Sequence, residues 1–274
     1  MLLKSIRLQL EHILNRKEAV FTWFLLLGFV TWNFISNIMQ NQNAVYVTQM
    51  YDPVKTLTLS TWSVSGYFMM SLYPLLIVIP TSTVYLHDKK SGEIIYLNAR
   101  YGNKKYMRGK FLGVCIATFL IFTLPFLMEI ILNAICYSAS SVGDPSNFEY
   151  IQTVEEVRRY FAYGIYTKNR FLYAIVCTLA FGAVSAVFAG FNYAVSTFKC
   201  FKYKIFTFFP IYILFFGIRF FGQAFKCSFT TNYFSVLRMF DTNVKNEKIY
   251  LIFMLMLFVL SFTIIEVKGR RNKL

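Results

Sequence analysis

Side chains that could act as nucleophiles or metal ligands are few in this chain of 274 residues, and they are scattered along it. It has only two histidines, His12 and His87, and its five cysteines show no CxxC spacing. Ser185, in the run GAVSAVFAG, has no histidine beside it to act as a base. The Glu-Glu pair at 155–156 resembles the start of an EExxxR protease motif, but Tyr160 stands at the arginine position. We therefore expect no catalytic residues, no metal site and no redox pair.

The chain also lacks a nucleotide-binding loop. The pattern GxxxxGK[ST] cradles phosphates with backbone N–H groups and places a lysine on them. The nearest stretch, GNKKYMRGKF, has the wrong glycine spacing and carries Phe111 after the lysine. We expect this chain to be no enzyme and to bind no cofactor. If ATP and Mg are used, a separate polypeptide must bind them.

The composition indicates a chain that lies in a membrane. Hydrophobic residues make up 57% and charged residues 15%, with a mean hydropathy of +0.49, against roughly 45–50% and about 25% in soluble domains. A helix of about 20 apolar residues crosses the hydrocarbon core, and unbroken apolar runs fit helices better than barrel strands. We predict an all-α membrane protein with one six-span domain at 18–274. The predicted spans are residues 18–39, 61–86, 111–137, 171–197, 205–221 and 249–267.

Basic residues are distributed unevenly among the segments outside these spans. Four segments hold 18 Lys and Arg in 55 residues, and the other three hold 9 in 81. The basic set comprises 1–17, 87–110, 198–204 and 268–274, and the other set comprises 40–60, 138–170 and 222–248. By the positive-inside rule the basic set is cytoplasmic, so both termini lie on the cytoplasmic side of the cell membrane. The net charge of +15 is thus a signal of topology. Anionic lipids are expected partners, and nucleic acid is not.

The first 17 residues have the pattern of an amphipathic helix. The apolar stripe holds Leu3, Ile6, Leu10, Ile13 and Leu14, and the polar stripe holds Lys4, Arg7, Glu11 and Asn15. We predict a helix at 1–17 that lies in the inner interface of the membrane. The alternative is a short cytosolic helix packed on a partner protein.

The connection at 87–110 carries seven basic residues, more than a simple turn needs. A partial apolar face is formed by Ile94, Ile95, Leu97 and Tyr101. Gly102 then breaks the pattern, and basic residues lead into the next span. We predict a short helix parallel to the membrane, which could transmit movement from a cytosolic partner. The alternative is a basic loop that only fixes orientation.

Four charged or glycine residues of this connection stand at a characteristic spacing. Asp88 is followed by Gly92 four positions later, by Arg100 eight positions after that, and by Lys110 at the start of the next span. This spacing resembles the coupling-helix region of type-2 ABC transporter permeases. The amphipathic N-terminus, six spans, inner termini and missing ATPase domain agree with that family. The resemblance implies an ATPase-coupling surface of Asp88, Gly92, Glu93, Arg100, Tyr101, Lys104, Lys105 and Lys110.

Two other segments bear on the resemblance. The segment at 222–248 is rich in aromatic and aliphatic residues, which fits the hairpin between the last two spans in that family. The segment at 138–170 is longer than the family's usual connection and has the spacing of an outer amphipathic helix. This departure puts the class of substrate in doubt more than the fold.

Polar residues at membrane depth form a second candidate site. Glu129 lies in the third span, Asn133 follows one turn later, and Arg219 lies near the outer end of the fifth span. An ionisable residue at the centre of a span costs about 2.5–3.5 kcal/mol on insertion scales. Glu129 and Asn133 could therefore line a substrate path, or Glu129 could pair with Arg219 to clamp two spans together.

The resemblance implies the membrane subunit of an ATP-driven ABC exporter, with a cytosolic ABC ATPase subunit as its partner. The permease would pair with a second copy or a related chain, and a small-residue face suits close helix contact, formed by Gly182, Ala186, Ala189 and Gly190. The cargo would be hydrophobic or amphipathic, such as an antimicrobial peptide or a drug. The alternatives are a non-transporting immunity or sensor-anchoring subunit and a secondary transporter. The lack of repeats and of midplane carboxylate pairs argues against the last.

Overall fold

The computed structural model describes most of the chain, in several stretches. These are residues 2–41, 52, 54–81, 83–137, 162–198, 201, 203–224, 237–239 and 247–271. Within them the regular secondary structure is helical, apart from one isolated parallel bridge between Ser60 and Met239, and turns and loops connect the helices. The expected hairpin at 222–248 and outer helix at 138–170 lie largely outside the described residues.

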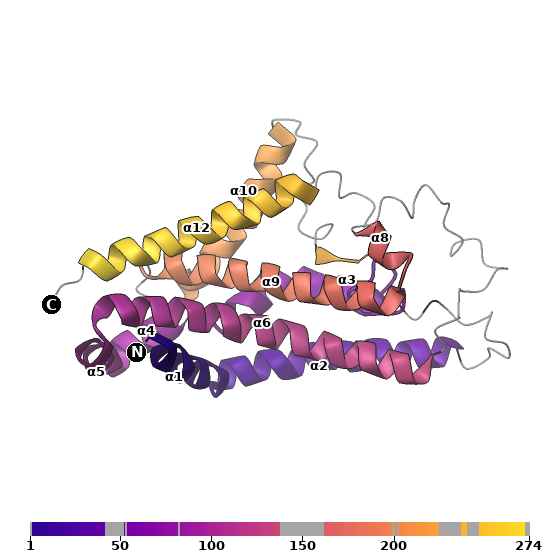
Figure 1. Cartoon of the computed structure of the whole chain (residues 1–274), viewed down its shortest axis with the longest axis horizontal. Helices are drawn as coiled ribbons and strands as arrows, with labels where there is room; N and C mark the ends of the chain where they lie inside the picture. The colour runs from indigo at the N-terminus through magenta and orange to yellow at the C-terminus, as the bar shows by residue number, and fades with distance from the viewer. Residues whose placement is uncertain are drawn as a thin grey trace.

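The helices follow the order of the apolar runs (Figure 1). They are α1 (Leu2–Leu14), α2 (Lys17–Asn41), α3 (Val64–Val78), α4 (Val84–Ser91), α5 (Glu93–Tyr101), α6 (Asn103–Cys136), α8 (Tyr163–Tyr166), α9 (Arg170–Ser196), a 3-10 helix at Lys204–Phe208, α10 (Phe209–Ala224) and α12 (Glu247–Arg271). Among the described residues, α2, α6, α9 and α12 are long and apolar enough to cross a membrane, and α3 and α10 are shorter. The all-α fold with membrane-type helices is confirmed, whereas the number of six spans stays a prediction.

The predicted span at 61–86 differs most from the structure. Helix α3 ends at Val78, and α4 begins only at Val84. The apolar run is interrupted here, because Pro80 lacks the backbone N–H that would extend the helix and Thr81, Ser82 and Thr83 follow it. The span predicted at 111–137 begins earlier, because α6 already starts at Asn103. Its polar first turns are therefore part of the same rigid helix.

Helix α6 lies at the centre of the fold, with α1, α2, α9 and α12 packed around it. The small-residue face of α9 contacts α6 inside the chain. A Cβ at Gly182 would overlap Thr123 Oγ1, and one at Gly190 would lie 3.0 Å from Cys115 Sγ. Because these pairs run in opposite senses along the two helices, α9 is antiparallel to α6. The face expected for close helix contact is thus already occupied by α6.

Two further contacts give the directions of the other long helices. Asn33 in the second half of α2 bonds Glu129 in the second half of α6, so these helices are parallel. A Cβ at Gly269, near the end of α12, would lie 3.3 Å from the Cα of Lys104 at the start of α6. Helix α12 is therefore antiparallel to α6 and parallel to α9.

The basic segments gather at one end of the molecule, the end of α1, α4 and α5 (Figure 1). The Lys268 ammonium lies 5.0 Å from the centre of the Tyr85 ring and 5.9 Å from that of Phe198. Asn103 Nδ2 donates to Gly269 O at 2.9 Å. Both the beginning of α1 and the end of α12 therefore lie toward this end.

The described parts of the less basic segments meet at the opposite end. Arg170 Nη1 lies 3.2 Å from Asp52 Oδ2. The backbone N–H of Met239 donates to Leu59 O at 2.8 Å. The more basic and the less basic connecting segments thus lie at opposite ends of the molecule.

We predict that Gly182→Val lowers the free energy of unfolding by about 1–3 kcal/mol, because the added methyl groups must enter filled space against Thr123. The measurement is thermal unfolding in detergent micelles, followed by circular dichroism. Gly28→Val in α2 is the matched control, since no atom lies within 4 Å of its added Cβ. An equal loss in both variants would contradict the packing described here.

Candidate functional site

The connection between α3 and α6 is folded into two short helices by glycines. Gly92 ends α4 and begins α5 with φ +76°, and Gly102 separates α5 from α6 with φ +76°. Residues with a Cβ rarely adopt this left-handed conformation, so glycine at both positions permits the two sharp bends. Helix α5 is thereby a separate short helix, with a bend at Gly92 before it and a bend at Gly102 after it.

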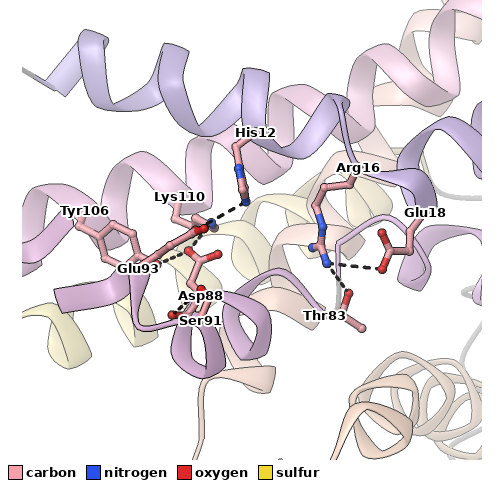
Figure 2. Close-up of polar contacts among 9 residues, drawn as sticks. All are labelled: His12, Arg16, Glu18, Thr83, Asp88, Ser91, Glu93, Tyr106 and Lys110. Atoms are coloured by element: carbon pink, nitrogen blue, oxygen red, sulfur yellow. Dashed lines mark hydrogen bonds and ion pairs between the residues drawn. The ribbon is translucent and has the colours of Figure 1, made fainter. Parts of the chain in front are cut away.

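A buried ion pair attaches α4 to α6 (Figure 2). Lys110 Nζ donates to Asp88 Oδ2, and both side chains are 0% exposed. The Tyr106 hydroxyl donates to the same oxygen at 2.6 Å. Removing one partner of a buried pair leaves an uncompensated charge, which costs about 3–5 kcal/mol. The pair therefore holds the end of α4 firmly on the first turns of α6.

Helix α5 lies at the surface, and none of its residues is buried. Ile94 and Leu97 pack in part against the core. On the outer side, Ile95 is 65% exposed and Tyr96 is 80% exposed. Arg100, also exposed, follows one turn later. The helix thus presents two large apolar side chains and a guanidinium away from the core.

The basic residues after Gly102 have different surroundings. Arg108 makes a bidentate pair with Glu266 of α12, at 2.6 and 2.7 Å. Lys104 Nζ lies 2.8 Å from the same carboxylate. These residues join α6 to α12, whereas Lys105 is exposed. Lys104, expected on the coupling surface, is therefore committed to a contact between helices.

The other residues expected at this site are divided between two surfaces. The Arg100 guanidinium lies 5.4 Å from the centre of the Tyr101 ring on α5. Glu93 faces α1 instead, with its Oε2 3.9 Å from His12 Nε2. The structure thus brings Asp88 and Lys110 together and leaves Arg100 and Tyr101 apart from them on α5.

Sequence reasoning missed one cluster at this end. His12 and His87 have ring centroids 6.3 Å apart. Each of His12, His87, Asp88 and Glu93 offers a ligand atom, and these atoms all lie within 4.8 Å of one another. No local spacing indicates this cluster, because α1 reaches it only by packing along α6.

The second candidate site holds an irregular segment, residues 54–60, all of which are buried. Glu129 Oε1 of α6 accepts from Thr58 N at 2.9 Å and from Thr58 Oγ1 at 2.7 Å. The same oxygen accepts from Asn33 Nδ2 at 2.8 Å. Because unpaired backbone groups are costly at membrane depth, irregular backbone there must be bonded to protein. Glu129 supplies one such bond to this segment.

Side-chain amides of α2 supply further hydrogen bonds to the segment at 54–60. Thr56 O accepts from Asn33 Nδ2 at 2.6 Å and from Asn37 Nδ2 at 2.7 Å. Asn133, one turn after Glu129, places its Nδ2 3.5 Å from Thr56 Oγ1. The residues that the sequence singles out at membrane depth therefore hold a chain segment in place.

The structure does not bring Arg219 to Glu129. The Arg219 side chain is exposed on α10, and the described partners of Glu129 Oε1 are Asn33 and Thr58. A clamp with Arg219 does not describe these contacts, and the substrate path stays a prediction. The carboxylate instead bonds the segment before α3, for which the sequence gives no signal because its partner includes a backbone N–H.

Comparison of the chain with protein-family models, with curated proteins and with solved structures finds no match.

We predict that Lys110→Met lowers the free energy of unfolding by about 3–5 kcal/mol, because Asp88 then stays buried without its counter-ion. The double variant Asp88→Asn with Lys110→Met should recover most of this loss, since it buries no charge. Unfolding in detergent micelles measures both. Lys105→Met removes a lysine of the same helix at an exposed position and should change stability by less than about 0.5 kcal/mol. A loss in Lys105→Met equal to that in Lys110→Met would refute the ion pair's role.

We predict that Glu129→Leu costs about 1–3 kcal/mol, because it leaves buried donors of Thr58 and Asn33 without their acceptor. Glu129→Gln keeps a carbonyl oxygen at that position and should cost less. The same unfolding measurement applies, and Arg219→Gln should be neutral because its side chain is exposed. If Arg219→Gln matched Glu129→Leu, the clamp between these two residues would be correct after all.

Proposed function

We propose that this chain crosses the membrane six times. Helices α2 and α6 are parallel, as are α9 and α12, so the chain must return once within each pair. The elements available for the return are α3 between α2 and α6, and α10 between α9 and α12. A helix of 15 residues such as α3 rises only about 22 Å. The buried segment 54–60 lies directly before it and supplies the remaining depth.

This arrangement supports an orientation with both termini in the cytoplasm. The charge bias of the connecting segments predicts that side, and the contacts of Lys268 and Asn103 gather the basic segments at one end. Arg and Lys near span ends are retained on the cytoplasmic side. Helices α1, α4 and α5 would then face the cytoplasm.

Within this topology, the chain acts as the permease subunit of an ATP-driven ABC exporter in the cell membrane. The observation that carries this proposal is α5, a surface helix bounded by two glycines and held to α6 through the buried Asp88–Lys110 pair. The spacing of Asp88, Gly92, Arg100 and Lys110 around this helix resembles the coupling region of type-2 permeases. A separate ATPase subunit would bind ATP and Mg and dock on α5.

The outer face of α5 indicates the chemistry of that docking. Tyr96 and Ile95 are large, exposed and adjacent, and exposed aromatic anchors commonly dominate binding energy in protein interfaces. Arg100 adds a positive charge one turn away. An ATPase surface that fits would have an apolar pocket with a carboxylate at its rim.

Movement of α5 can reach the far side of the protein through one helix. Lys110 and Glu129 both belong to α6, separated by roughly 28 Å at the helical rise. Lys110 is bonded to Asp88 of α4, which leads through Gly92 into the docking helix α5, and Glu129 is bonded to the segment before α3. Closure of an ATPase pair would thus shift α6 and the segment at 54–60 together, which can exchange inward-facing and outward-facing packings.

The resemblance also carries the remaining parts of the proposal. Two permease subunits, either two copies or this chain with a related one, would enclose the path. The cargo would be hydrophobic or amphipathic, in the class of antimicrobial peptides and drugs.

Affinity purification in mild detergent tests this function. We predict that a polypeptide with ATPase activity co-elutes with the wild type, and that Ile95→Asp with Arg100→Glu reduces its amount at least about 10-fold, because two docking contacts are lost. Lys168→Glu, an exposed charge reversal at the opposite end, should leave the ATPase bound.

The other outcomes are also informative. If no nucleotide-hydrolysing partner co-elutes with the wild type, the permease function is contradicted and a non-transporting membrane subunit is favoured. If the partner stays bound to the α5 variant, the docking surface lies elsewhere than α5.

A further inference from the structure

The two histidines of the chain meet at the junction of three helices. His12 comes from α1, His87 and Asp88 come from the middle of α4, and Glu93 begins α5. One potential ligand atom from each lies within 4.8 Å of the others. Two imidazoles and two carboxylates are a donor set that suits zinc.

Asp88 provides an independent sign of a missing ligand. Its Oδ2 accepts from both Lys110 and Tyr106. Its Oδ1 is buried and has no hydrogen-bond partner among the described residues. A buried carboxylate oxygen without a partner loses its hydration and regains nothing. A cation bound at this oxygen would remove that cost, and a ligand atom of each histidine and of Glu93 lies within 4.8 Å of a carboxylate oxygen of Asp88.

A pocket leads to the cluster from the surface. It has a volume of about 250 Å³ and lies between α1 and α5. His12 and Glu93 line it together with Leu8, Gln9, Tyr96 and Leu97. An ion and its hydration water can therefore reach His12 and Glu93 through this pocket.

The charges around the cluster also favour a cation. Asp88 and Glu93 supply two negative charges, and Lys110 offsets one of them. Arg16 is nearby, but its guanidinium bonds Thr83 at 3.1 Å and Glu18 at 3.5 Å (Figure 2). Glu18 balances the charge of Arg16, so Asp88, Glu93 and Lys110 together leave one net negative charge.

We propose that His12, His87, Asp88 and Glu93 bind one Zn²⁺ ion, with Asp88 contributing Oδ1. Metal–ligand distances of about 2.0–2.2 Å require the four side chains to draw together, and the exposed side chains of His87 and Glu93 can rotate to do so. Mg²⁺ and Ca²⁺ prefer oxygen ligands alone and should not compete. The bound ion would fasten α1 to α4 and α5 and so fix the orientation of α5.

This inference rests on the cluster and not on transport, so it can fail while the permease function stands. The experiment uses the full chain in detergent micelles, purified with a tag that contains no histidine and freed of metal with a chelator. Titration with ZnSO₄, followed by calorimetry and by metal analysis after dialysis, should give one tightly bound Zn²⁺ per chain.

The variant His12→Gln with His87→Gln should lose this zinc or bind it at least about 100-fold more weakly, because both nitrogen ligands are gone. Glu11→Gln is the matched control, since Glu11 neighbours His12 on α1 but pairs with Arg7. Circular dichroism without metal checks that both variants are folded. Zn²⁺ should raise the unfolding temperature of the wild type and of Glu11→Gln only.

A visible absorption spectrum with Co²⁺ in place of Zn²⁺ gives a second readout that does not depend on stability. A tetrahedral spectrum is expected from the wild type and from Glu11→Gln, and not from the double histidine variant. Less than one retained Zn²⁺ in the wild type, or equal binding by the folded double histidine variant, would overturn the proposal.

Discussion

A carboxylate removed from water must keep its counter-ion, and in this protein that constraint joins a surface element to the central helix. Asp88 and Lys110 are both fully buried, and neither can leave the other without a cost of several kcal/mol. Helix α5 begins five residues after Asp88 and is otherwise only partly packed. Its position, and therefore the surface formed by Ile95, Tyr96 and Arg100, depends on this pair.

The same principle acts toward the other end of α6. Glu129 bonds the irregular segment at 54–60, whose backbone would otherwise lie unpaired among apolar helices. One continuous helix therefore carries two buried carboxylate contacts of different kinds, one through Lys110 and one through its own Glu129. A displacement applied at α5 can therefore reach the segment before α3 through α6, which is the physical basis for the coupling that we propose.

The sequence predicts long apolar helices well, because composition over 20 residues fixes them with little help from tertiary contacts. It also singled out Asp88 and Lys110 by their spacing, although their mutual pairing was not foreseen. The partner of Glu129 could not be predicted, since it includes the Thr58 backbone in an irregular segment. The meeting of His12 with His87 was equally hidden, because it depends on how α1 packs along α6. The end of α3 at Val78 is hard to predict because the average hydropathy of 61–86 stays high despite Pro80 and the three hydroxyl residues after it.

The central claim is that α5 meets a nucleotide-hydrolysing partner at the cytoplasmic face. Photo-crosslinking in intact cells tests it most directly, with a photoreactive amino acid at Tyr96 on α5 and, for comparison, at Lys168 toward the opposite end. Mass spectrometry then identifies the attached polypeptide. We predict that position 96 captures a protein with a phosphate-binding loop and that position 168 does not. Capture of no such protein from position 96, or of the same one from both positions, would contradict it.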